Sequence, residues 1–155
     1  MTASITAFAP VSSPIAFRLP LSARAPLVKL DTVIAARGEN AHVIEKFVEE
    51  GRLRWVFNVA VKAHGMRDLR FWSREVSAFA ASQRDELAAI HGADLRAVVN
   101  EILGDRRQFS SGDMCLLLGV RRATLMRLRG ALLAPCGHLF PRAGLESFLK
   151  RRLVQ

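Results

Sequence analysis

The chain has 155 residues, with 23 Lys and Arg against 14 Asp and Glu, which gives a formal net charge of +9. Half of its residues are hydrophobic, yet no apolar run approaches the length of a membrane-spanning helix, so no membrane span is predicted. A chain of this length can hold two small hydrophobic cores of about 50 residues each.

Residues 1–28 differ in composition from the rest of the chain. They contain Pro10, Pro14, Pro20 and Pro26, several Ser and Thr, and no carboxylate. Prolines at this density exclude a continuous helix, because each removes a backbone donor and fixes φ. We expect a mostly extended, mobile arm; a basic arm that lies along a DNA groove is the alternative. The features of a secretory signal are missing, and we expect a cytoplasmic protein, nucleoid-associated if bacterial.

Residues 29–80 form the first predicted domain. Gly38 is followed by apolar residues at helical spacings, and Gly51 comes thirteen residues after it. Residues 53–70 are rich in β-forming side chains around Gly65, which predicts a large β wing. The candidate DNA contacts are Asn40, which could hydrogen-bond an adenine edge, and basic residues that could hold phosphates: Lys46, Arg52, Arg54, Lys62 and Arg67.

Residues 81–107 are predicted to be a helical linker of one or two helices. Gly92 and Gly104 interrupt a series of apolar residues at helical spacings: Leu87, Ile90, Leu95, Val98, Val99, Ile102 and Leu103. Packing in the core or between domains explains these residues most simply, and a homodimer seam is the alternative.

Residues 108–155 form the second predicted domain. Ser110 followed by Asp113 is typical of a capping box, so a helix is expected over 111–118. Gly119 can take the left-handed conformation that a sharp turn requires.

A second helix is expected over 121–129, the recognition helix. Leu125 and Leu128 lie three residues apart and can face the core, while the other faces are almost entirely cationic. Candidate DNA contacts are spread over the two helices, the presumed wing and the start of the last helix: Ser111, Arg121, Arg122, Thr124, Arg127, Arg129, His138 and Arg142.

These residues resemble the MerR/excisionase-like winged helix-turn-helix family, most clearly over 109–149. The matching residues are Ser110, Asp113, Met114, Cys115, Leu118, Gly119, Val120, Thr124, Leu125 and Arg127, followed by Phe140, Leu145 and Phe148 after the wing. Leu132 departs from the pattern, because the family has glycine there. The resemblance implies a short two-stranded wing and a helix that enters the major groove of double-stranded DNA.

The first domain looks like a diverged copy of the second. Three apolar residues near its end repeat the spacing of three in the second domain at a constant offset of 69: Phe71, Val76 and Phe79 against Phe140, Leu145 and Phe148. We therefore expect a mainly α fold with short β wings, made of tandem winged helix-turn-helix domains joined by a helical linker. A chance similarity of short helical spacings is the alternative.

Positive charge is concentrated in the last third of the chain. Residues 106–155 hold ten Lys and Arg against two acids, whereas residues 30–105 hold ten against twelve. Because phosphate neutralisation dominates nucleic-acid affinity, the second domain is the expected DNA contact. Carboxylates of the first domain, such as Glu45 and Glu49, would repel phosphate. The role of that domain is left open between a weaker DNA contact and protein binding or dimerisation.

We expect a sequence-specific double-stranded DNA-binding protein that acts as a transcriptional regulator. The alternatives are an excisionase-like architectural factor that bends DNA in site-specific recombination, and an adaptor between a protein and DNA. No catalytic motif is visible, so no enzyme activity and no cofactor are expected. Cys136 and His138 offer only two metal ligands, so no metal site is expected either.

Overall fold

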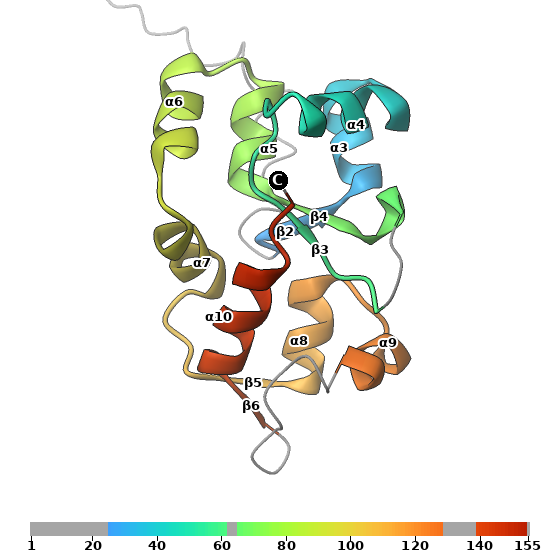
Figure 1. The fold of residues 1–155 in the computed structure, drawn as a ribbon, viewed down its shortest axis with the longest axis vertical. Coiled ribbons are helices and arrows are strands. Elements are labelled where there is room, and N and C mark those ends of the chain that lie inside the picture. The colour runs from blue at the N-terminus through green and yellow to red at the C-terminus, as the bar shows by residue number, and fades with distance from the viewer. Residues whose placement is uncertain (1–24, 62–64, 129–138, 155) are drawn as a thin grey trace, which may run out of the picture.

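The computed structural model describes residues 25–61, 65–128 and 139–154, which form a mainly helical fold with two small antiparallel sheets (Figure 1). This confirms a mainly α fold with short β elements. Every helix in the described ranges is too short or too polar to cross a bilayer. The elements in chain order are β2 (Leu27–Lys29), α3 (Leu30–Arg37), α4 (Ala41–Glu49), β3 (Val56–Asn58), the 3-10 helix η1 (Met66–Asp68), β4 (Leu69–Trp72), α5 (Ser73–Ala80), α6 (Arg84–Gly92), α7 (Leu95–Leu103), β5 (Gln108–Ser110), α8 (Ser111–Leu118), α9 (Arg122–Leu128), β6 (Leu139–Pro141) and α10 (Arg142–Arg151).

The order of elements from β2 to α5, here called the first unit, recurs from β5 to α10, the second unit. In both, a strand leads into a helix that ends at a left-handed glycine, Gly38 with φ +71° and Gly119 with φ +64°. A second helix follows in each unit. A later strand then pairs antiparallel with the first strand and leads into the last helix. Phe71 of β4 and Phe140 of β6 hold equivalent positions in the two registers, opposite Val28 and Phe109.

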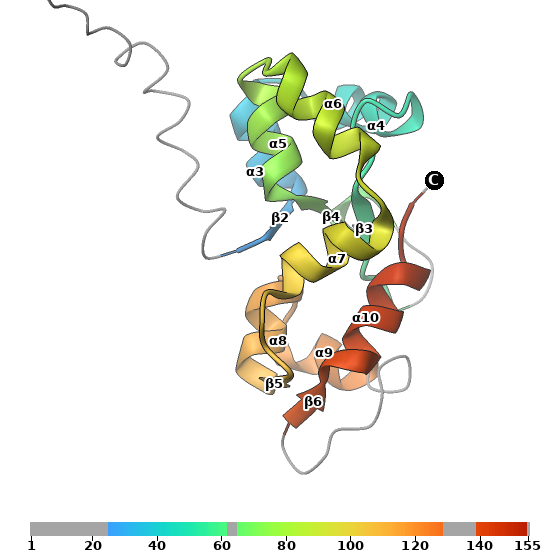
Figure 2. The same cartoon turned by 90° about the vertical axis from the view of Figure 1, so that its left-hand side faces the viewer.

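The sheet of the first unit has the order β2-β4-β3 and separates two hydrophobic cores. Successive side chains of a strand point to opposite faces. On one face the strands pack with α3, α4 and α5 through Val28, Val56 and Phe71. On the other face Leu27, Phe57 and Trp72 join a core that includes α7, α8, α9 and α10. Figure 2 shows these strands between the two lobes of the molecule.

This sheet corrects the expected wing of the first domain. The segment 53–70 does contain β3 and part of β4, but Phe57 is 0% exposed and all four residues of β4 are buried. A run of β-forming residues fits an exposed ribbon and a strand buried on both faces equally well, so the pattern alone did not separate them. Residues 27 and 28, which were assigned to the arm, also lie buried in β2.

The C-terminal residues of the second unit return to the sheet of the first. The amide of Val154 donates to the carbonyl of Val56 at 2.8 Å, and the amide of Asn58 donates to the carbonyl of Arg152 at 2.8 Å. An antiparallel bridge joins Phe57 and Leu153. The two units therefore share backbone hydrogen bonds as well as a hydrophobic core.

The predicted linker consists of α6 and α7, which pack against α5 and α10 respectively. Its buried apolar residues belong to the core that both units share: Ile90, Val98, Val99, Ile102 and Leu103. The indole nitrogen of Trp55 donates to the carbonyl of Ile90 at 2.8 Å. Glu75, which is 1% exposed, accepts from the amides of Arg54 and Trp55 and lies 2.7 Å from His91 Nε2. The structure thus favours packing between the units for these residues.

Candidate nucleic-acid interface

Helix α8 begins and ends where the sequence predicts. The Ser110 hydroxyl accepts from the amide of Asp113 at 3.0 Å, and the amide of Ser110 donates to the Asp113 carboxylate at 3.1 Å. Gly119 ends the helix in the left-handed conformation. Both boundaries of α8 are thus set by local contacts.

Asp113 also forms an ion pair, because its carboxylate lies 2.7 Å from the guanidinium of Arg106. The Ser110 amide and Arg106 together lower the pKa of the Asp113 carboxyl below its usual value of 3.8. A lowered pKa means that the carboxylate stabilises the folded state above pH 3.8 and that this stabilisation is lost as the pH falls through the folded-state pKa.

We predict that Asp113→Ala lowers the free energy of unfolding by about 1 kcal/mol at neutral pH, the typical value of a helix cap. The difference from the unsubstituted protein should shrink as the pH falls below 3.8, which urea unfolding at several pH values measures. Asp105→Ala, at an exposed residue before β5, is the control. If the difference in the free energy of unfolding between the two proteins stayed constant over this pH range, a stabilising role for the charged Asp113 would be contradicted.

Helix α9 presents a cationic face. Leu125 and Leu128 are 0% and 1% exposed and fix the inner face of the helix. Arg121, Arg122 and Arg127 are exposed, while Thr124, a further candidate contact, is half-buried. An α-helix with its side chains is about 10–12 Å in diameter, which fits the width of a DNA major groove, about 12 Å. The prediction of a short helix with an apolar inner face is confirmed.

The turn between α8 and α9 is held by Arg70, a buried residue of β4 in the first unit. Its Nε donates to the carbonyl of Leu118 at 2.7 Å, and its Nη2 donates to the carbonyl of Gly119 at 2.9 Å. Its Nη1 donates to the carbonyls of Arg67 and Leu69. Burial lowers the pKa of the Arg70 guanidinium. Arg70 supplies donors to the last carbonyls of α8, which have no partner within the helix.

We predict that Gly119→Ala lowers the free energy of unfolding by about 2–3 kcal/mol, for two reasons. Alanine is strained at φ +64°, and its Cβ would lie 3.0 Å from Arg70 Nε and 3.1 Å from Lys29 Cε. Gly38→Ala is the matched control, because Gly38 has the same backbone conformation with nothing within 4 Å, so we expect about 1 kcal/mol there. Urea unfolding measures both values, and equal losses would contradict the close packing at Gly119.

Other predicted contacts of the second unit lie at its edges. Ser111 is the first residue of α8 and is half-buried. Arg142 donates through Nη1 to the carbonyls of Gly104 and Arg106 at 2.5 and 2.8 Å, and its Nε donates to Glu146 at 2.7 Å. These bonds hold α10 against the chain that follows α7, so we leave Arg142 out of the proposed contacts. Arg129 and His138 lie outside the described residues, as does Cys136.

The predicted contacts of the first unit are not gathered at one site. The Asn40 side chain caps α4 by accepting from the amide of Val43 at 3.0 Å. Arg54 donates to the carbonyl of His91 at 3.0 Å and covers the ring of Trp55. Lys46 is exposed on α4 and Arg67 is exposed on η1. Lys62 lies outside the described residues.

Arg52 and Arg37 of the first unit pack on aromatic rings. The Arg52 guanidinium lies 4.5 Å from the ring centre of Phe47, and that of Arg37 lies 4.5 Å from the ring centre of Phe79. Arg52, which the sequence suggested as a wing contact, therefore covers the core of the first unit.

Helix α4 holds in the first unit the place that α9 holds in the second, but its exposed face is different. Glu45 and Glu49 on the helix and Glu50 at its end are exposed, beside Lys46 and His42. Three carboxylates against one lysine would repel a phosphate backbone. The equivalent helices of the two units thus differ in the ligand that they can attract.

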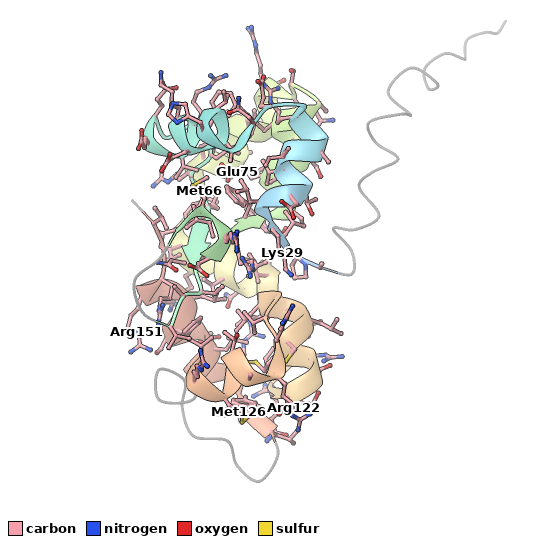
Figure 3. All side chains as sticks on the ribbon, turned by 90° about the vertical axis from the view of Figure 1, so that its right-hand side faces the viewer. Lys29, Met66, Glu75, Arg122, Met126 and Arg151 are labelled. Carbon is pink, nitrogen blue, oxygen red and sulfur yellow. The ribbon has the colours of Figure 1, made fainter. Side chains whose placement is uncertain are left out.

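Two exposed residues beside the turn were missed by the sequence analysis. Lys29 ends β2 and places its Cε against Gly119, and Met126 is 40% exposed among the arginines of α9. Figure 3 shows Lys29 near the boundary between the two lobes, and Arg122 and Met126 in the lower lobe. Lys29 holds the N-cap position of α3, equivalent to that of Ser110 before α8, but its side chain makes no capping hydrogen bond.

In the part of the chain that the structure describes, no three His, Cys, Asp or Glu residues are grouped as a metal site would require. No protein-family model, no curated protein and no solved structure matches this chain. The function is therefore argued from the site alone.

Proposed function

We propose that this protein binds double-stranded DNA in a sequence-specific manner, with α9 in the major groove. One observation carries the proposal: the exposed Arg121, Arg122 and Arg127 lie on α9 or directly before it, and the inner face of this helix is fully buried. Arginine is the side chain best suited to bind phosphate and the edge of guanine, because its planar fork donates two parallel hydrogen bonds. The proposed domain is similar to the winged helix-turn-helix of the MerR/excisionase-like family.

Five residues on or directly before α9 have proposed roles. Arg121 and Arg122 reach bases or phosphates at the start of the helix, and Arg127 anchors the backbone. Thr124 contacts a base methyl group or a phosphate. Met126 adds an apolar surface that suits the methyl group of thymine.

The proposed biological role is control of transcription. The rival role, DNA bending in site-specific recombination, would use the same contacts of α9 with DNA. Promoter occupancy with an altered transcript level would support regulation. Several protomers on adjacent sites with strong bending of the duplex would support the rival.

The acidic face of α4 favours a second candidate, an adaptor in which the first unit holds a protein and the second holds DNA. A partner that is captured by the full chain, lost on substitution of Glu45, Glu49 and Glu50, and retained with Arg121→Ala would support this candidate.

The proposal is tested by fluorescence anisotropy of a short labelled duplex over a series of salt concentrations. Contacts from Arg121, Arg122 and Arg127 to three phosphates predict that the logarithm of affinity falls with the logarithm of salt with a slope of about −3 or steeper. Absence of binding, or binding that does not depend on salt, would contradict the proposal.

A further inference from the structure

Two exposed cations of the first unit lie beside the turn that precedes α9. The Cε of Lys29 lies 3.1 Å from the position that a Cβ on Gly119 would take. The carbonyl of Arg67 accepts from Arg70 Nη1 at 2.8 Å, and the same guanidinium donates through Nη2 to Gly119 at 2.9 Å. A single side chain, that of Arg70, therefore links the backbone of Arg67 to the turn.

We use the name junction cluster for the four exposed cations on the chain segments that meet at this turn: Lys29, Arg67, Arg121 and Arg122. Asp68, the carboxylate that follows Arg67 in the chain, accepts from the amide of Gly65 at 3.1 Å and interacts with the buried Arg70. Positive charge thus continues from α9 across the boundary between the units.

The backbone segments that carry the junction cluster are tied together, because Arg70 is buried and bonded to both units. These segments cannot separate by movement of one unit relative to the other without breaking these bonds. Cations on segments that are held together suit a ligand with closely and regularly spaced charges. A DNA duplex, with one negative charge for about every 1.7 Å of its axis, is such a ligand.

We infer that Lys29 and Arg67 bind the phosphate backbone of the duplex that α9 enters, so that the first unit contacts DNA through the junction cluster and not through α4. This inference rests on the proposed function. It gives the first unit a positioning role on DNA, since phosphate contacts fix the register of a protein without selecting a sequence. The carboxylates of α4 are then compatible with DNA binding because α4 does not face the duplex.

The test compares two double variants of the full chain on the same labelled duplex. Lys29→Gln with Arg67→Gln removes the two first-unit cations of the junction cluster, and Arg84→Gln with Arg96→Gln removes two exposed cations on α6 and α7. We expect the first variant to lose about fivefold in affinity for each lost contact near physiological salt, and its salt slope to fall by about 1.8 in magnitude. The control should keep both values, and thermal unfolding should show that both variants are folded.

An unchanged slope and affinity for the Lys29→Gln, Arg67→Gln variant would overturn the inference. If the Arg121→Gln, Arg122→Gln variant still lost binding in the same assay, the proposed function would stand without it. Equal losses in the control would also overturn the inference, because the effect would then follow net charge and not position. Absence of binding by the unsubstituted protein would overturn both.

Discussion

Replacing Arg121 and Arg122 with glutamate is expected to weaken binding to duplex DNA by about a hundredfold or more. Two donors to phosphates or base edges are lost, and each bidentate arginine contact to a base is typically worth about 1–3 kcal/mol. The new carboxylates would also face the phosphates. Because both arginines are exposed at the start of α9, the fold should be retained, and fluorescence anisotropy at fixed salt measures the loss.

The control for this prediction is Arg84→Glu with Arg96→Glu, which changes the net charge by the same amount. Both residues are exposed on α6 and α7, on the side of the molecule away from α9 (Figure 1). We expect these substitutions to reduce affinity severalfold at most, through the long-range field alone. Equal losses for the two pairs would contradict a contact at α9 and leave only an attraction between net charges.

Arg70→Leu is expected to lower the free energy of unfolding by about 2–4 kcal/mol, because buried carbonyls lose their donor. The carbonyls of Leu118 and Gly119 end α8, and that of Arg67 lies in the first unit. The loss is therefore shared by both units, and urea unfolding should remain a single transition with a lower midpoint.

Arg74→Leu is the matched control for Arg70. Arg74 is exposed and makes ion pairs with Glu86 at 2.9 Å and Glu101 at 2.8 Å. Exposed pairs contribute little, and we expect a change below about 1 kcal/mol. A loss as small for Arg70→Leu as for Arg74→Leu would contradict the structural role of Arg70 at the junction.

The helix pair α8 and α9 of the second unit could be predicted from the sequence because its signals are local. The capping box at Ser110, the left-handed turn at Gly119 and the buried Leu125 each depend on residues within a few positions. The same kind of signal explains Asn40. An asparagine before an apolar helical run is a typical N-cap. The Asn40 side-chain oxygen is already bonded to the amide of Val43, and this bond competes with the predicted contact to adenine.

The junction between the units could not be predicted, because it depends on contacts between residues far apart in the chain. The sheet that separates the two cores combines β2, β3 and β4, and residues 152–154 pair with β3 from the other end of the sequence. A buried arginine such as Arg70 has no pattern of its own in a sequence with many surface arginines. Lys29 was missed for the same reason, since only the folded chain brings it to Gly119.

The most direct test of the central claim is selection from a random duplex library at near-physiological salt, followed by sequencing of the retained DNA. The unsubstituted protein and the Arg121→Glu, Arg122→Glu variant are compared. We predict that the unsubstituted protein enriches a defined motif and that the variant loses it. Retention without any enriched motif would reduce α9 to a phosphate anchor and contradict sequence-specific binding, and no retention at all would contradict DNA binding through this helix.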